Sequence, residues 1–428
     1  MAKVTSSQSG HSESSLKEVT ITGESGTSIG IHPGIIQFSY FESLLQDSIV
    51  ATATYADSGV NGPGGKNVLE GLPVVGGEKV KVKFKDGNDE MISVDLFLKN
   101  DPTSGDTTTT GVYNLHMVSE EIRTNNRTRI PIRFDGQPSD HVRQILTQYL
   151  KTSKKLDIED TLIPRNFCGN LKKPIYLINW LCQHSVPTTG GSFGKTAGFF
   201  YYETSEGIKF KSIDFLLGQE PKSRIIYNGT PDKRGEKIPQ GYDVCALYYK
   251  KTNRNDVDLK EQMGAYSTRI INFNPFNCLY EVSDYTAESF MGSYKLGGKK
   301  MPTGGSSDYT RTVWSVRDIG TLLSGSTSQQ IEKSKEENFK VSEIRNQAIM
   351  RYNQLFVSQV NITIPSDYTL HAGDTIFFDA PSQQENLKND EVDKQVGGLY
   401  IIAALCHFVT PRENLTNLTL VRDSFGRK

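Results

Sequence analysis

The chain has 428 residues, of which 36% are hydrophobic and 10% aromatic, enough to build about two to four domains with cores of their own. A formal net charge of -1 argues against a protein that holds nucleic acid or an anionic membrane through a general electrostatic field. No stretch approaches the ~18 consecutive apolar residues of a membrane-spanning helix. Five scattered cysteines without a C-x-x-C pair indicate free thiols in a reducing compartment.

The N-terminal third predicts an arm followed by a small β-domain. Residues 1–30 are rich in Ser, Thr and Gly and poor in large apolar residues, which predicts an extended or mobile arm. In the stretch EKVKVKFKD, Val80, Val82 and Phe84 alternate with lysines, as expected for a strand with one solvated face. Similar strands separated by turn-rich loops predict a first antiparallel β-barrel domain over residues 31–137.

The pattern changes at Pro138 and predicts an inserted α+β domain over residues 138–225. SDHVRQILTQYL and KKPIYLINWLCQHSV have apolar residues at helical spacing, and Pro174 stands near the start of the second helix, where its missing N–H costs nothing. GFFYYET and GIKFKSID then predict a β-hairpin that turns around residues 205–207.

The remaining chain predicts a second β-barrel domain in two pieces, residues 226–290 and 353–428, with additional strands. Between the pieces, residues 291–352 read as a Gly/Ser-rich insertion followed by a charged helix. GEKVKVKF and GVYNLHMVSEE resemble GDTIFFD and GLYIIAALCHF, and a long polar loop separates the members of each pair. We interpret this as one barrel module used twice, while chance similarity between strands is the alternative. The predicted fold class is therefore α+β and β-rich, with two similar small antiparallel barrels, an inserted α+β domain and irregular loops.

One loop, residues 189–196, matches the motifs of two enzyme classes. GGSFG fits the G-x-S-x-G pattern of serine hydrolases around Ser192, and GKT fits the end of a phosphate-binding loop around Lys195. Both motifs require a strand before the loop and a helix after it, whereas this sequence predicts the reverse order. We interpret the loop as a helix-to-strand connection. The alternative is a hydrolase or nucleotide-binding enzyme that uses Ser192 or Lys195, with His371 or His407 available for a hydrolase triad.

No other pattern predicts chemistry, so we expect no catalytic, cofactor-binding or metal-binding residues. Cys182 and His184 lie two apart on a predicted helix, and Cys406 and His407 are adjacent on a predicted strand, so each pair faces different directions. The remaining candidates are expected to be solvated or structural: Glu120, Glu121, Glu159, Asp160 and His116.

Dense aromatic runs at residues 199–202, 248–249 and 271–277 leave two interpretations open. They belong either to strands buried on both faces or to a surface that a partner covers, where aromatic residues are enriched.

The layout resembles the central baseplate hub protein of T-even-type contractile-tailed bacteriophages. The resemblance is carried by EIRNQAIMRYNQLFVSQVNITIPSDYTLHAGDTIFFDAP and GGLYIIAALCHFVTPRENLTNLTLVRDS, which are similar to the second barrel of that family. DHVRQILTQYL, PIYLINWLCQHSV and GFFYYETSEGIKFKSID look like its inserted domain, and IIQFSYFESLLQDSIVATATYADS resembles its first barrel. Residues 1–30 and 291–330 depart from the family.

The resemblance implies a structural virion protein of the phage tail baseplate, made and assembled in the host bacterial cytoplasm, with tail-tube-like barrels and no catalytic residues or cofactors. It implies a homotrimer that joins the trimeric central spike to the hexameric tail tube or a tube-initiator protein. The implied hub contacts the tape measure protein and the surrounding wedge proteins, encloses a channel that DNA crosses only in transit, and does not insert into a membrane.

Overall fold

A computed structural model describes residues 15–427 except 60–61, 101, 107–110, 189–196, 228–237, 239, 253–255, 275–277, 291–294, 302–310, 317–325, 330–340 and 383–391. The chain is β-rich with separate helical parts, which confirms the predicted α+β class. Its largest sheet has 15 strands and contains the strands of two modules, defined below.

The first module is an antiparallel sheet in the order β2-β1-β5-β6-β8-β4-β3, with β7 paired to β8. Apolar residues alternate along β4 and β5, and the module has one core around Phe38, Val82 and Leu115. The strands are β1 (Leu16–Thr22), β2 (Ser28–Gly30), β3 (Ile35–Ser43), β4 (Val50–Asp57), β5 (Lys79–Lys85), β6 (Met91–Leu98), β7 (Thr103–Asp106) and β8 (Gly111–Val118), and the loops contain η1 (His32–Gly34), η2 (Pro63–Gly65) and α1 (Val68–Gly71).

The predicted N-terminal arm over residues 1–30 is wrong for residues 16–30, because β1 and β2 belong to this sheet. β1 pairs with β5 along its whole length, and Val19 and Ile21 are completely buried in the core. Thr is a good strand former, and alternating apolar residues are enough to bury one face of a strand. The low overall hydrophobicity of residues 1–30 therefore did not indicate the strand. Residues 1–14 lie outside the described part of the chain.

The inserted part packs helices against a three-stranded sheet in the order β10-β13-β12. The hairpin predicted around residues 205–207 is present, since Thr204 pairs with Gly207. Its elements are α2 (Glu120–Arg127), β9 (Arg133–Phe134), α3 (Pro138–Gln144) with a π-helical continuation η3 (Ile145–Tyr149), β10 (Leu156–Ile158), β11 (Phe167–Cys168), α4 (Pro174–Cys182), β12 (Phe199–Thr204), β13 (Gly207–Ser212) and α5 (Ile213–Leu217).

The second module has the strand order β15-β14-β21-β22-β23-β20-β16 and its own apolar core around Ile362, Phe378 and Leu420. Only Leu247 separates β15 from β16, so the chain itself joins the two ends of this circuit. The strands are β14 (Ser223–Tyr227), β15 (Val244–Ala246), β16 (Tyr248–Lys251), β20 (Ser358–Pro365), β21 (Thr375–Asp379), β22 (Gly398–Val409) and β23 (Asn414–Arg422). Among the described strands neither module closes into a barrel through hydrogen bonds alone.

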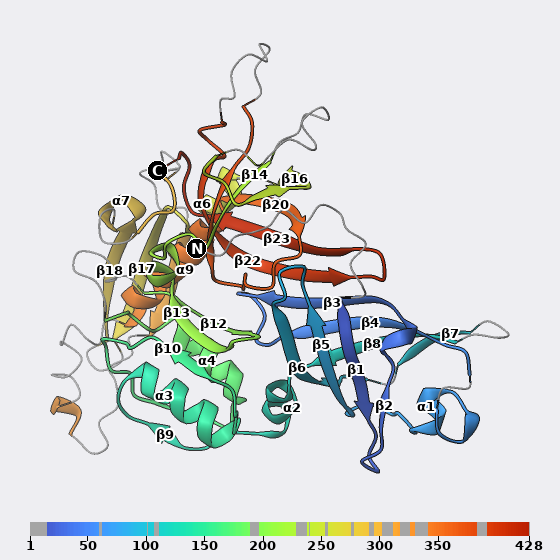
Figure 1. Cartoon of the computed structure of the whole chain (residues 1–428). Coiled ribbons are helices and arrows are strands. Elements are labelled where there is room, and N and C mark those ends of the chain that lie inside the picture. The colour runs from blue at the N-terminus through green and yellow to red at the C-terminus, as the bar shows by residue number, and fades with distance from the viewer. Residues whose placement is uncertain are drawn as a thin grey trace.

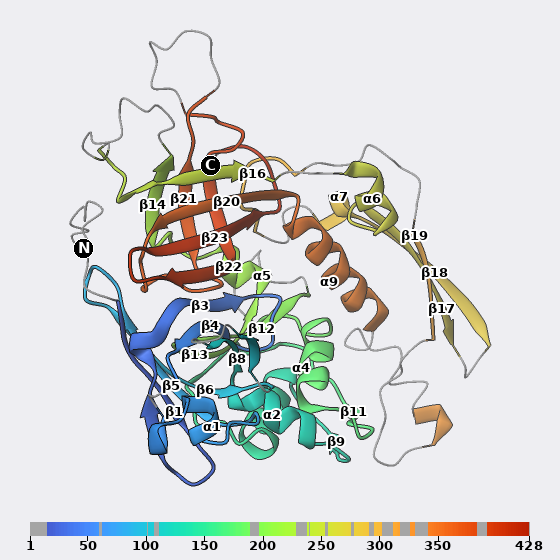
Figure 2. The same cartoon turned by 90° about the vertical axis from the view of Figure 1, so that its right-hand side faces the viewer.

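A separate sheet of β17 (Ser267–Asn274), β18 (Leu279–Thr286) and β19 (Arg311–Val316) lies to one side, beyond α9 (Val341–Leu355) in Figure 2. The sequence places residues 267–286 within the second barrel domain and its additional strands; among the described strands, β17 and β18 pair only with each other and with β19. The neighbouring short helices are α6 (Val257–Gln262) and α7 (Ala287–Phe290).

The two modules share their strand order, which supports the predicted duplication. In the first module β5-β6-β8-β4-β3 pair as antiparallel neighbours, and in the second β21-β22-β23-β20-β16 do the same in the same chain order. A cross-strand hydrogen bond recurs at the matching position: Thr54 donates to Asn114 over 3.0 Å, and Thr363 donates to Asn417 over 2.7 Å.

One part of the predicted correspondence is wrong. The sequence comparison matched the strand GVYNLHMV with GLYIIAALCHF, that is β8 with β22, whereas strand order matches β8 with β23 and β6 with β22. A Gly followed by a Tyr marks a strand that leaves a loop, and this local signal occurs at either strand of a hairpin. The two strands of a hairpin differ in the strands with which they pair, and the sequence alone does not show this pairing.

The modules join edge to edge where β22 pairs with β3, as Figure 1 shows at the boundary of the red and blue strands. β22 pairs with β21 along its first residues and with β3 from Ala404 to Val409. A bulge between Ile402 and Ala404 marks this change of partner, in keeping with the role of bulges in re-aiming strands.

Candidate functional site

The loop with the two enzyme-like motifs, residues 189–196, lies outside the described residues, and with it Ser192 and Lys195. Its flanks are described: α4 ends before it at Cys182, and β12 begins after it at Phe199. The predicted order of helix, loop and strand is therefore confirmed. Because a phosphate loop and a hydrolase elbow both require the opposite order, the surrounding fold supports neither motif.

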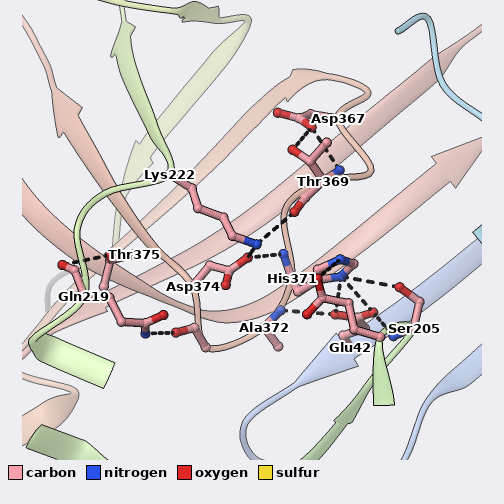
Figure 3. A network of polar contacts seen from close by, with 12 residues as sticks. Glu42, Ser205, Gln219, Lys222, Asp367, Thr369, His371, Ala372, Asp374 and Thr375 are labelled. Atoms are coloured by element: carbon pink, nitrogen blue, oxygen red, sulfur yellow. Dashed lines mark hydrogen bonds and ion pairs between the residues drawn. The ribbon is translucent and has the colours of Figure 1, made fainter. Parts of the chain in front are cut away.

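A buried polar cluster lies where the two modules and the inserted part meet (Figure 3). Glu42 of β3 has no exposed surface and accepts hydrogen bonds from three backbone and side-chain groups of other segments. The Ser205 amide donates over 2.8 Å, the Ala372 amide over 3.1 Å, and Nδ1 of His371 lies 3.3 Å away. Tyr40 adds its hydroxyl over 2.8 Å from the same strand. One carboxylate thus links three parts of the chain.

The cluster contains a serine, a histidine and an acid, but its connections differ from those of a catalytic triad. In a triad the acid and the serine meet opposite nitrogens of the imidazole. Here Glu42 and the Ser205 hydroxyl both face Nδ1 of His371, at 3.3 and 3.5 Å, while Nε2 lies 3.7 Å from Glu206. This geometry offers no path for a proton from Ser205 through the ring to Glu42.

Charge explains the arrangement better than catalysis does. Burial alone would lower the pKa of His371, but its hydrogen bond to Glu42 and the negative charges nearby outweigh burial, so the pKa is raised. Burial would raise the pKa of Glu42, yet His371 and the donating amides hold it below its usual value. Both shifts favour the charged forms, an imidazolium beside a carboxylate, and a protonated histidine cannot act as a general base.

The segment from residue 367 to 375 is tied down by further contacts that Figure 3 shows. Lys222 forms an ion pair with Asp374 over 2.7 Å, and Asp374 accepts from the His371 amide over 2.8 Å. Gly373 has a φ of +88°, and a Cβ there would lie 2.2 Å from the hydroxyl of Tyr202. Only glycine combines that backbone angle with so close an approach.

A second buried carboxylate, Glu203 of β12, joins the inserted part to the first module. It accepts from the Ile49 amide over 3.2 Å and from the Ser119 hydroxyl over 2.9 Å. Lys154 pairs with both Glu203 and Glu121 over 2.5 Å. Burial raises the pKa of Glu203 despite this lysine. The polar network therefore fixes the parts of the chain relative to one another.

The cysteine and histidine candidates do not form a metal site. Within the described residues no group of three or more His, Cys, Asp or Glu side chains could hold a metal ion. His184 stacks on Trp180, and burial raises the pKa of the Cys182 thiol. His407 stacks on Tyr40 with ring centroids 5.8 Å apart, and burial lowers its pKa to about 3, so this imidazole is a neutral part of the core.

Two of the predicted surface carboxylates are buried, which corrects the expectation for Glu121 and Glu159. Glu121 is paired with Lys154, and Glu159 accepts from the Ser212 amide over 2.7 Å and from its hydroxyl over 3.0 Å. The partners come from distant segments, so nothing local in the sequence revealed them. Glu120, Asp160 and His116 are exposed.

The aromatic runs divide between core and surface. Residues 199–202 are all buried: Phe199 and Tyr201 pack into the core of the inserted part, while Phe200 and Tyr202 pack into a cluster against the second module. The first interpretation, a strand buried on both faces, is therefore correct for β12. By contrast, Tyr248 of β16 is 54% exposed.

An apolar face is exposed on the β17–β18–β19 sheet. The register places Val282, Ile271 and Trp314 in one row across the three strands and Tyr280, Phe273 and Val316 in the next. Trp314 and Val316 are each 66% exposed and Tyr280 is 61% exposed. A contiguous patch of this kind is typical of an interaction surface. Among the described residues no helix is long and apolar enough to span a membrane.

Comparisons with known proteins show the fold. No protein-family model matches the chain, and no curated protein is similar to it in sequence. Among solved structures it is similar to the 43 kDa tail protein of prophage MuSo2 from Shewanella oneidensis, with a TM-score of 0.54 and 12% identity over 95% of this chain and 99% of that one. It is also similar to a tail protein from Neisseria meningitidis, with a TM-score of 0.53 and 8% identity over 95% of this chain and 96% of that one.

The chain therefore has the fold of solved phage tail proteins along almost its whole length. At such low identity these structures establish the fold alone. They do not distinguish the hub of T-even-type phages from other phage tail proteins.

Proposed function

We propose that the protein is a non-enzymatic structural component of a phage tail baseplate: a homotrimeric hub that joins the trimeric central spike to the hexameric tail tube. The observation that carries this proposal is the internal duplication. Two modules with the same strand order lie edge to edge in one chain. Three chains then supply six similar modules, which suits a part that must match threefold symmetry on one side and sixfold symmetry on the other.

The fold of solved phage tail proteins supports this assignment to a virion tail. In the proposed hub, the ring encloses a channel for the tape measure protein and, in transit, for DNA. A formal net charge of -1 suits such a conduit, since a strongly basic surface would hold DNA through its phosphates. Further proposed partners are a tube or tube-initiator protein and the surrounding wedge proteins.

The buried polar cluster fits a mechanical role. Glu42 and Glu203 hold the two modules and the inserted part in one arrangement, and a ring that transmits force needs rigid units. Removing one partner of a buried ion pair is strongly destabilising. The network therefore favours one arrangement of the two modules and the inserted part.

The test is the mass of the purified protein in solution at micromolar concentration, alone and with its spike protein. A trimer is expected. A chain that stays monomeric under both conditions, and never joins spike or tube, contradicts the proposal.

A further inference from the structure

Each module has several strands that pair on one side only among the described residues, and two of them, β16 and β7, lie at equivalent positions of the duplication. In the second module β16 pairs only with β20, and in the first module β7 pairs only with β8. An open edge presents unpaired N–H and C=O groups and is a template for another strand.

The duplication identifies what these edges match. β16 occupies the position of β3, because both are the outer neighbours of equivalent strands, β20 and β4. β7 occupies the position of the last residues of β22. β7 pairs with the start of β8, and the last residues of β22 pair with the start of β23, which is the strand equivalent to β8. Within the chain, β3 and β22 are the two strands that join the modules. The open edges of β16 and β7 are therefore equivalent to the edges of β3 and β22 that pair with each other inside the chain.

The register of the equivalent positions follows from the shared Thr–Asn pair. Aligning Thr363 with Thr54 places Tyr249 at the position of Phe38 and Lys251 at that of Tyr40. Aligning the turns that follow β7 and β22 places Asp106 at the position of Val409 and Ser104 at that of His407. In the existing interface Phe38 pairs with Val409, and Tyr40 pairs with His407.

The hydrogen-bond directions agree with this alignment. The Thr252 amide donates to Gln359 of β20 over 3.0 Å, so alternation directs the amides of Tyr249 and Lys251 away from β20. In the existing interface the Leu44 amide donates to Ala403 over 2.8 Å, so the amides of Phe38 and Tyr40 point to β22. Equivalent residues therefore present their amides to the same side.

We propose that β16 of one copy pairs with β7 of a second copy as antiparallel strands, in the register Tyr249–Asp106, Lys250–Gly105 and Lys251–Ser104. This inference rests on the proposed ring and specifies how its subunits join. The contact is head-to-tail, repeats the contact inside each chain, and so produces a ring. Leu247, 56% exposed, and Tyr248, 54% exposed, lie at the start of this edge.

A cysteine cross-link tests the register. In the proposed ladder Lys250 and Gly105 form a non-hydrogen-bonded pair, whose short Cβ separation suits a disulfide. The double variant Lys250→Cys with Gly105→Cys should yield covalently linked chains up to the full ring under mild oxidation, and lose them on reduction. The control is Lys250→Cys with Ser104→Cys, which differs by one residue and directs the two thiols to opposite faces. Variants with only Lys250→Cys or only Gly105→Cys control for disulfides between a new cysteine and a native one.

A backbone change tests the pairing without cysteines. Lys251→Pro removes an amide that points away from β20 and leaves the internal ladder intact, so the folded subunit should persist while assembly weakens at least tenfold. Lys251→Ala keeps the amide and should assemble nearly as well as the unchanged chain.

The outcomes separate the two proposals. A trimer that neither forms the specific cross-link nor responds to Lys251→Pro overturns the strand pairing and leaves the hub proposal standing. Equal cross-linking in the double variant and its one-residue control also overturns the pairing. A chain that stays monomeric alone and with its spike overturns both.

Discussion

Replacing Glu42 by Gln should destabilise the folded chain strongly and in a pH-dependent way. Glu42 is fully buried and favours the protonated form of His371 beside it, so the variant removes the nearest counter-charge of that imidazolium. Removing one member of a buried ion pair costs about 3–5 kcal/mol. The amide of Gln would also oppose one of the two backbone amides that now donate to the carboxylate. We expect a loss of about 3 kcal/mol or more near pH 6.

The pH dependence follows from the two shifted pKa values. The pKa of His371 is raised, so its stabilisation is complete below the ordinary histidine value of about 6.5 and is lost as the pH rises through the raised value. The pKa of Glu42 is lowered, so its stabilisation is complete above about 4.3 and is lost as the pH falls through the lowered value. The difference between the original chain and the variant should therefore be greatest at about pH 4.5–6.5.

The assay is unfolding in denaturant from pH 4 to 9, with the midpoint compared between the two proteins. Asp95→Asn is the control, because Asp95 pairs with Lys79 at the surface and both side chains are about half exposed. Such surface pairs contribute about 0–1 kcal/mol. A Glu42→Gln midpoint equal to that of the control, or a difference that does not vary with pH, would refute the ion-pair reasoning.

Three further outcomes are expected. Gly373→Ala should destabilise the chain by at least about 1 kcal/mol in thermal unfolding, because the residue has a positive φ and its Cβ would meet the hydroxyl of Tyr202; an unchanged midpoint would contradict this. Ser192→Ala and Lys195→Ala should leave oligomer mass unchanged, and ester or ATP turnover that either change abolishes would favour the enzyme alternative. The pair Trp314→Ser with Val316→Ser should leave the unfolding midpoint within about 0.5 kcal/mol and reduce binding of a hydrophobic dye, since both side chains are exposed; a large destabilisation would show that they belong to the core.

Local patterns predicted much of the fold. Alternation found β5 and β6, helical spacing found α3 and α4, and the residues between β12 and β13 predicted their turn. The separation of β17–β19 into a sheet of its own was missed, because strands with equal alternation pair according to tertiary contacts. The domain limits at residues 138, 226 and 353 stay predictions.

The buried polar cluster could not be predicted from the sequence. Glu42, Ser205 and His371 are separated by more than 160 residues from one another, and each looks ordinary in its own segment. From the sequence alone, a carboxylate on a strand is expected to be solvated, because its partners are not known. The same reason explains the wrong expectations for Glu121 and Glu159. The sequence did indicate the duplication, although strand pairing was needed to align β8 with β23 correctly.

The most direct test of the central claim is low-resolution imaging of the purified protein, alone and with its spike. The images should show a threefold ring of six similar lobes around a central channel, because each chain contributes two modules joined edge to edge. Single two-lobed particles under both conditions, with no ring, would contradict it.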